Sequence, residues 1–224
     1  MPSREVFLTP GEVYHVFNRG ITNQLTFLDT RDYDHLLETC VYYQKLASPV
    51  RFSYFIRLSK SLKQEILQRR DKGVSGIEII AFCLMPNHFH LLVKQLTDQG
   101  ITDFLRKVTN SYTRYFNTHR RRNGPLFQGR FKAVKIDNGQ QLLHVSRYIH
   151  LNPYSAGIVN KFSDLENYPY SSFKQFTHEY YNQTCNPKII LELFSDRQAY
   201  RQFVLNNADY QRELHHIKHL LIDT

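Results

Sequence analysis

The chain has 224 residues, of which 42% are hydrophobic and 14% aromatic, a composition that fits a globular core and excludes an intrinsically disordered protein. Its three cysteines are widely spaced and form no CxxC pair, so neither a disulfide framework nor a thiolate zinc site is indicated. The N-terminus lacks the apolar core of a signal peptide, and no stretch reaches the roughly 18 apolar residues of a membrane helix. We therefore expect a cytoplasmic protein with no membrane partner.

The first half of the chain predicts one strand, one helix and an insertion. Residues 13–18 form a short apolar run that ends at a glycine turn, which is typical of a strand. Residues 31–46 carry apolar side chains at helical spacing and predict a helix with one buried side. Residues 48–76 follow neither pattern and contain one polar, basic helix candidate at 59–70. We interpret this segment as an insertion that either packs as an accessory element or recognises a hairpin foot or a partner chain.

The second half predicts a hairpin, two helices and one more strand. Residues 77–83 and 88–95 are apolar strand candidates joined by a turn that contains Pro and Asn, so we expect them to pair. A helix is expected at 101–119. The alternation at 131–136 predicts a half-buried strand, and a helix follows at 139–151, where Pro153 is expected to stop it.

The order of these elements predicts an α+β fold of the ferredoxin-like class: an antiparallel sheet with helices on one side, plus an appended helix. We expect this domain to span residues 1–160. Residues 161–224 are expected to form a mostly helical accessory tail, with helix candidates at 189–194 and 196–222.

Positive charge is concentrated in the middle of the chain. Lys and Arg number 29 against 20 acids, and residues 104–135 contain nine bases and no acid, so this segment accounts for the whole excess. The nine bases are Arg106, Lys107, Arg114, Arg120, Arg121, Arg122, Arg130, Lys132 and Lys135. Phenylalanine and tyrosine lie between these basic residues, and the mixture is suited to bind phosphates and unstacked nucleobases. A solvated helix surface is the alternative interpretation.

The tripeptide His88-Phe89-His90 lies on a predicted strand. Alternate side chains of a strand share a face, so both imidazoles are expected on one side, with Phe89 in the core. Paired imidazoles can ligate a divalent cation. Two packed or surface histidines are the alternative, and an HxH pattern alone does not distinguish the two.

On the predicted helix 139–151 and its end, His144, Tyr148 and Asn152 recur every four residues and therefore share one face. Asn152 could complete a metal shell through its amide oxygen, and Tyr148 could direct its hydroxyl at a phosphate. His144 is a candidate accessory base. The alternatives are an ordinary core-facing tyrosine and a histidine that packs against a helix or contacts DNA.

Three ordered strings stand at 85–93 (MPNHFHLLV), 124–133 (GPLFQGRFKA) and 148–153 (YIHLNP), together with Tyr14-His15-Val16 and Arg19-Gly20 near the first strand. These motifs resemble the single-tyrosine HUH transposases of the IS200-like superfamily, especially the REP-associated tyrosine transposase branch. The resemblance covers roughly residues 10–160.

This resemblance implies an enzyme that cleaves and rejoins single-stranded DNA at hairpin-forming repeats. It implies that His88 and His90 are metal ligands and that Tyr148 is the nucleophile of a 5′-phosphotyrosine link. Asn152 would be the third ligand, where related transposases place Gln. The implied cation is Mg²⁺, which Mn²⁺ can replace.

The DNA-binding set that we expect comprises the nine bases of 104–135, with His15 and Arg19 near the first strand as further contacts. A homodimer, with Tyr148 acting on its own site or on the partner's, stays open. Two alternatives are a relaxase or replication-initiator nickase and a non-catalytic nucleic-acid-binding module. A second tyrosine and a third histidine, which are typical of the nickases, are not evident near Tyr148 or His90.

Overall fold

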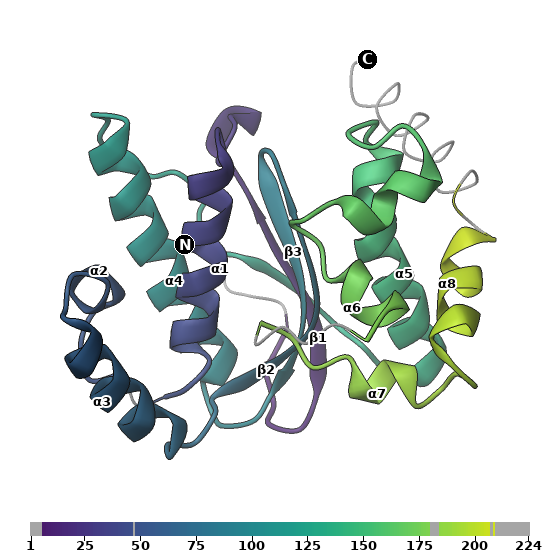
Figure 1. The fold of residues 1–224 in the computed structure, drawn as a ribbon, viewed down its shortest axis with the longest axis horizontal. Coiled ribbons are helices and arrows are strands. Elements are labelled where there is room, and N and C mark those ends of the chain that lie inside the picture. The colour runs from purple at the N-terminus through teal and green to yellow at the C-terminus, as the bar shows by residue number, and fades with distance from the viewer. Residues whose placement is uncertain (1–5, 47, 180–183, 207, 209–224) are drawn as a thin grey trace.

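The computed structural model describes residues 6–46, 48–179, 184–206 and 208. Its centre is a four-stranded antiparallel sheet in the order β2-β3-β1-β4 (Figure 1). The strands are β1 (Val13–Arg19), β2 (Ile77–Met85), β3 (His88–Gln95) and β4 (Lys132–Lys135). This strand order is that of the ferredoxin-like fold, so the predicted fold class is confirmed.

One face of the sheet is covered by α1 (Thr30–Tyr43) and α4 (Gly100–His119) (Figure 1). The side chain of Asp29 caps α1 by accepting a hydrogen bond from the backbone N–H of Asp32. Helix α4 buries an apolar stripe that includes Leu105, Val108 and Tyr112 against the alternate side chains of β1, β2 and β3.

The opposite face is covered by α5 (Gly139–Ser155) and by elements that follow it in the chain. These are a short 3-10 helix η2 (Phe162–Asn167), α6 (Phe173–Thr177), α7 (Lys188–Leu191) and α8 (Arg197–Leu205). The backbone N–H of Ser172 donates to Phe82 of β2, and that of Asn186 donates to Ile79. The described part of the tail therefore shares a core with the sheet and α5, and the division at residue 160 stays a prediction.

The segment 48–76 is helical. It contains α2 (Phe52–Phe55) and α3 (Lys60–Asp71), the second of which confirms the predicted helix at 59–70. The aromatic rings of Phe52 and Phe55 are buried beside Tyr42 of α1, so the apolar residues of this segment anchor α2 to the domain.

Several predicted boundaries were wrong. Helix α5 does not stop at Pro153 but continues to Ser155, because a proline near the end of a helix removes only one of its last hydrogen bonds. Strand β2 extends to Met85, so the turn of the hairpin is Pro86-Asn87 alone. The helix candidate 196–222 contains α8, and its part beyond residue 208 lies outside the described residues. None of the described helices combines the length and apolarity that a membrane crossing requires.

Candidate active site

Strand β3 holds both histidines of the HxH pattern on the face toward α5. The intervening Phe89 points into the core beneath α4, as the alternation of the strand predicts. The His88 and His90 rings are perpendicular, with centroids 4.9 Å apart. The neighbouring residues on β1 are Arg19 opposite His88 and Phe17 opposite His90.

Helix α5 brings Tyr148 to these histidines. Asn138 caps the helix through a side-chain hydrogen bond from the N–H of Gln141, and buried residues such as Ile149 hold it on the sheet. The Tyr148 ring lies 5.5 Å from the His90 ring, centroid to centroid, at an interplanar angle of 84°. The tertiary structure thus brings together the imidazoles and the phenol, which are far apart in the sequence.

These side chains line an open cavity of about 350 Å³. Its walls are Phe17, Asn18, Arg19, His88, His90, Gln128, Arg130, Lys132, Tyr148 and Asn152. Tyr148 is 37% exposed and Asn152 only 4%. The side-chain nitrogen of Asn152 donates to the backbone carbonyl of Tyr148 at 2.8 Å, so its amide oxygen is the atom with lone pairs to offer a ligand.

Hydrogen bonds orient both imidazoles. The Nδ1 of His88 lies 2.6 Å from the side-chain oxygen of Asn87, which can only accept, so the neutral His88 ring carries its proton on Nδ1 and leaves Nε2 unprotonated. The Nδ1 of His90 lies 2.9 Å from Nε2 of His15. Sequence analysis missed both interactions, although Asn87 stands within the MPNHFH string and His15 shares the face of β1 that bears Phe17 and Arg19.

Burial keeps His90 and His15 uncharged at neutral pH. It lowers the pKa of His90 well below its ordinary value, with smaller contributions from His88, His15 and Arg19, and it lowers the pKa of His15 to about 4. Burial raises the pKa of Tyr148, an effect that the Asn152 side chain and Arg19 partly oppose. The phenol is therefore protonated before any reaction.

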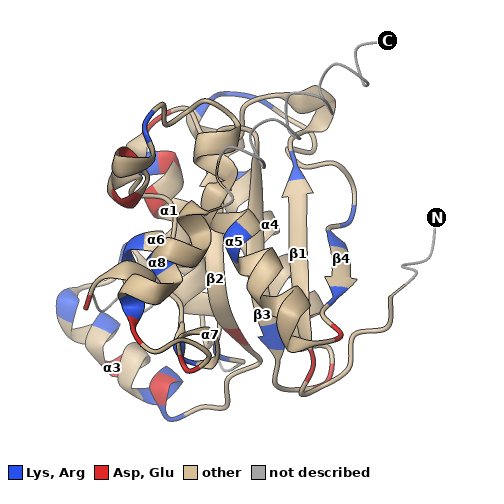
Figure 2. Ribbon diagram, turned by 90° about the vertical axis from the view of Figure 1, so that its right-hand side faces the viewer, with Lys and Arg blue, Asp and Glu red and all other residues tan. Residues whose placement is uncertain are grey.

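Three of the basic residues that we expect to bind DNA surround the cavity: Arg19, Arg130 and Lys132. Figure 2 shows Lys and Arg at the end of β1 and at both ends of β4, beside α5. Within the described chain, no carboxylate forms an ion pair with any of these three side chains. His15, another predicted contact, is only 8% exposed and lies against His90.

The other predicted bases lie elsewhere. Lys135, on β4, pairs with Glu12 at 3.3 Å. The Arg120 guanidinium pairs with Asp29 and with the buried Asp32, at the start of α1. The remaining five belong to α4 or to the loop after it, on the far side of the sheet from Tyr148: Arg106, Lys107, Arg114, Arg121 and Arg122. The acid-free segment is therefore not one continuous surface.

His144, the candidate accessory base, is absent from the walls of the cavity. Its Nδ1 accepts a hydrogen bond from Arg147 at 2.7 Å, and its ring approaches Phe203 of α8. Among the described residues, no group of three or more His, Cys, Asp and Glu side chains is arranged to hold a metal. A cation at this cavity would need the amide oxygen of Asn152 in addition to the histidine pair.

Comparison with known proteins supports the resemblance. The family model described as "Transposase IS200 like" matches residues 49–152, a segment that includes the histidine pair, Tyr148 and Asn152. No match is found among curated proteins.

Among solved structures, the chain is similar to a REP-associated tyrosine transposase bound to a REP hairpin, at 17% identity over 83% of this chain and 92% of that one, with a TM-score of 0.57. A putative transposase from Deinococcus radiodurans matches at 14% identity over 66% and 95% of the two chains, with a TM-score of 0.34. The tRNA(His) guanylyltransferase from Saccharomyces cerevisiae matches at 13% identity over 92% and 81%, with a TM-score of 0.36. The chain thus shares its ferredoxin-like fold with the first of these structures, and residues 49–152 are similar to the IS200-like transposase family.

Proposed function

We propose that this protein cleaves and rejoins single-stranded DNA with Tyr148 as its nucleophile. The observation that carries the proposal is the position of the Tyr148 ring, 5.5 Å from the His90 ring across a cavity that is open to solvent. A partly exposed phenol beside two imidazoles and the basic side chains of Arg19, Arg130 and Lys132 is suited to attack on a phosphodiester.

The donor atoms around the cavity fit a divalent cation. Burial keeps His90 uncharged, and a hydrogen bond to Asn87 orients the His88 ring. The amide nitrogen of Asn152 is already hydrogen-bonded, so two ring nitrogens and one amide oxygen are available as ligands. This set suits Mg²⁺ or Mn²⁺ when further positions are filled by substrate or water. A bound cation would polarise the scissile phosphate and offset the charge that its oxygens gain during the reaction.

The side chains of the protein supply the remaining chemistry. Arg19, Arg130 and Lys132 would hold the phosphates on both sides of the scissile bond. As the Tyr148 oxygen bonds to phosphorus, the bond to the 3′ oxygen breaks, and the proton that the phenol loses is balanced by the one that the 3′ oxygen gains. This leaves a 5′-phosphotyrosine and a free 3′-hydroxyl. Attack by a 3′-hydroxyl on the phosphotyrosine reverses both changes, so rejoining needs no added energy source.

We infer hairpin-forming repeats as the substrate class. The support is the shared fold with a transposase solved on a REP hairpin. The basic residues of α4, which lie far from the cavity, are consistent with a substrate that also extends beyond the cleavage point.

The test uses a hairpin library from the flanks of the gene, labelled at the 3′ end, because a 5′-phosphotyrosine keeps the 3′ fragment on the protein. The wild-type chain is expected to yield a labelled adduct that survives denaturation. Tyr148→Phe is expected to abolish the adduct and to bind the DNA within about twofold of wild type, since only the hydroxyl is lost. Tyr54→Phe, at an exposed tyrosine far from the cavity, is the matched control and should form the adduct normally. Adduct formation by the Tyr148→Phe protein would assign the nucleophile to another residue.

A further inference from the structure

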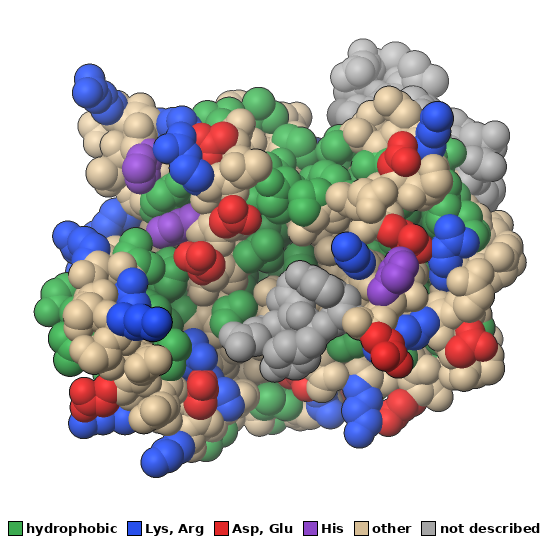
Figure 3. Space-filling view, viewed as in Figure 1, with side chains coloured by type: hydrophobic (Ala, Val, Ile, Leu, Met, Phe, Trp, Pro, Cys, Tyr) green, Lys and Arg blue, Asp and Glu red, His purple; other side chains and the backbone are tan. Residues whose placement is uncertain are grey.

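A second basic hollow lies between α2 and α4. It has a volume of about 690 Å³, and we call it the α2–α4 groove. Five basic side chains line it, two from the insertion and three from α4: Arg51, Arg57, Arg106, Lys107 and Arg114. No Asp or Glu is among its lining residues. In Figure 3, Lys, Arg and His side chains gather along the left margin, over α4 and the insertion helices.

The groove is remote from the candidate active site. Helix α4 packs on the face of the sheet opposite α5, so the sheet and the α4 layer separate the groove from Tyr148 (Figure 1). None of the residues around the Tyr148 cavity also lines the groove. A nucleic acid that occupies both places must pass around the edge of the domain.

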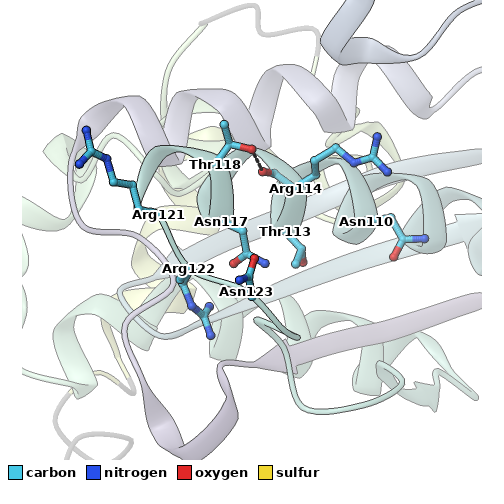
Figure 4. A pocket seen from close by; sticks show the side chains of 8 residues that line it. All are labelled: Asn110, Thr113, Arg114, Asn117, Thr118, Arg121, Arg122 and Asn123. Carbon is cyan, nitrogen blue, oxygen red and sulfur yellow. Dashed lines mark hydrogen bonds between the residues drawn. The ribbon is translucent and has the colours of Figure 1, made fainter.

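The exposed side of α4 continues the groove as a stripe of hydrogen-bond donors. Lys107, Asn110, Arg114 and Thr118 recur every three or four residues, opposite the buried apolar stripe of the same helix, and Arg121 follows in the loop after the helix. Four of these five residues line the adjoining pocket shown in Figure 4. Within α4 the stripe extends from Lys107 to Thr118, over 11 residue steps or about 17 Å. Arg, Lys, Asn and Thr are among the side chains that donate hydrogen bonds to phosphates and sugars.

Helix α2 holds its two arginines on a fixed support. The side chains of Phe52 and Phe55 are buried, and the backbone N–H of Phe52 donates to the Tyr43 hydroxyl at 2.9 Å. The Tyr42 hydroxyl donates to the carbonyl of Val50 at 2.8 Å. The exposed Arg51 and Arg57 are therefore presented on an anchored turn rather than on a loose loop.

The aromatic rings of the groove are already in contact with other side chains. Tyr115 stacks on His35 with centroids 3.8 Å apart, and the Lys107 ammonium lies over the Tyr43 ring at 6.0 Å. Single-strand binding relies on ring faces on which unpaired bases can stack. The groove offers positive charge but few accessible ring faces. It is therefore better suited to the backbone of a duplex, whose nucleobases stay stacked on one another.

We propose that the α2–α4 groove binds the sugar-phosphate backbone of a DNA duplex stem, while the unpaired flank of the same molecule enters the Tyr148 cavity. The inference rests on the proposed function, because it assigns one part of a hairpin substrate to each surface. A stripe of about 17 Å matches roughly five phosphates along one strand, at 3.4 Å per base pair. The insertion would thus act as the stem-recognising part of the transposase.

The test compares two charge reversals of equal size. Arg51→Glu with Arg57→Glu alters the groove, and Lys60→Glu with Lys63→Glu alters α3, outside the groove. The probes are a blunt hairpin with a 12-base-pair stem and an unstructured strand of equal length, each titrated at several salt concentrations by fluorescence anisotropy. The groove variant is expected to lose at least tenfold in hairpin affinity, to lower the salt slope by about 2, and to change affinity for the unstructured strand less than twofold. The α3 variant should bind both probes within about threefold of wild type.

The variant with both Arg51→Gln and Arg57→Gln removes the same charges without reversing them, and it serves as the control for misfolding of the Glu variant. It is expected to lose less hairpin affinity than the Glu variant, but in the same direction. Unchanged hairpin binding in both groove variants would overturn the proposal, as would an equal loss for the two probes, which would indicate a single-strand surface or a general charge effect. Adduct formation on the unstructured strand is scored separately. A wild-type chain that binds the hairpin through the groove but forms no adduct would contradict the Tyr148 chemistry alone.

Discussion

At the scale of single residues, the pair His15 and His90 sets the chemistry of the cavity. If His90 is to offer Nε2 to a cation, its proton must sit on Nδ1 and be donated to Nε2 of His15, 2.9 Å away. His15 is buried and its pKa is lowered to about 4, so it is neutral and able to accept this proton at pH 7. We therefore interpret His15 as a residue that positions His90 rather than as a direct contact to DNA.

Replacing His15 tests this interpretation. His15→Leu is expected to weaken Mn²⁺ binding by about 10- to 100-fold, the usual cost of removing a hydrogen-bond partner of a metal ligand. His15→Gln keeps an acceptor and should recover part of the loss. Binding is measured by titration with Mn²⁺ followed by electron paramagnetic resonance, without DNA. His178→Leu, at an exposed histidine of the tail, is the control. Equal Mn²⁺ affinity in His15→Leu and wild type would refute the positioning role.

At the scale of elements, the rotation of α5 is fixed by the tail. Residue His150 faces away from the cavity, where its ring nitrogens lie 2.7 Å from the Tyr200 hydroxyl of α8 and 2.8 Å from the Ser172 hydroxyl. The Tyr200 hydroxyl also donates to Ser146 at 3.1 Å. All four side chains are buried. Because Tyr148 lies two residues before His150, this network orients the helix that presents the phenol.

Removing one hydroxyl from the network should loosen α5. Tyr200→Phe keeps the ring but leaves His150 and Ser146 short of a buried partner, which is expected to lower the free energy of unfolding by about 1–3 kcal/mol. Urea denaturation measures the change. Tyr54→Phe removes a hydroxyl at an exposed position and should alter the free energy by less than about 0.5 kcal/mol. Equal stability of the two variants would show that the network contributes nothing.

The long elements were predictable because their patterns are local. The alternation of β3 and the helical spacing of 101–119 identify a strand and a helix without reference to the rest of the chain. Helix α2 and η2 were missed, since four to six residues carry too little periodicity to predict a helix. The predicted end of α5 was wrong because Pro153 occupies the last turn of the helix, where the missing backbone N–H costs little stability.

At the scale of the whole molecule, buried histidines predict a dependence of stability on pH. Burial lowers the pKa of His150 to about 3, whereas the unfolded chain has a histidine pKa of about 6.5. Below pH 6.5 the unfolded state binds a proton that the folded state does not, so stability falls as pH decreases from 6.5 toward 3.

At pH 5 this single residue is expected to lower the free energy of unfolding by about 2 kcal/mol relative to pH 7. Urea denaturation between pH 5 and pH 7 checks the loss. His150→Gln should show a smaller decline over the same range, because glutamine does not titrate. Parallel pH curves for the two proteins would mean that His150 is not held neutral by the fold.

Charge also has a whole-molecule arrangement that its sequence position conceals. The nine bases of 104–135 are contiguous in the chain, but they divide among the Tyr148 cavity, the outer side of α4 and internal ion pairs such as that of Arg120 with Asp32. The division arises because the chain passes from α4, on one face of the sheet, to the β4 edge and then to α5 on the other.

The sequence by itself determined which side chains share a face: His88 with His90 on a strand, and Tyr148 with Asn152 on a helix. These relations follow from backbone periods of 2 and 3.6 residues, which act over a few neighbours. Only the tertiary structure decided that the Tyr148 ring meets His90, that His15 lies against that histidine, and that α2 faces α4 across a groove. Such contacts depend on how layers pack across two cores, and local periodicity contains no distances between layers.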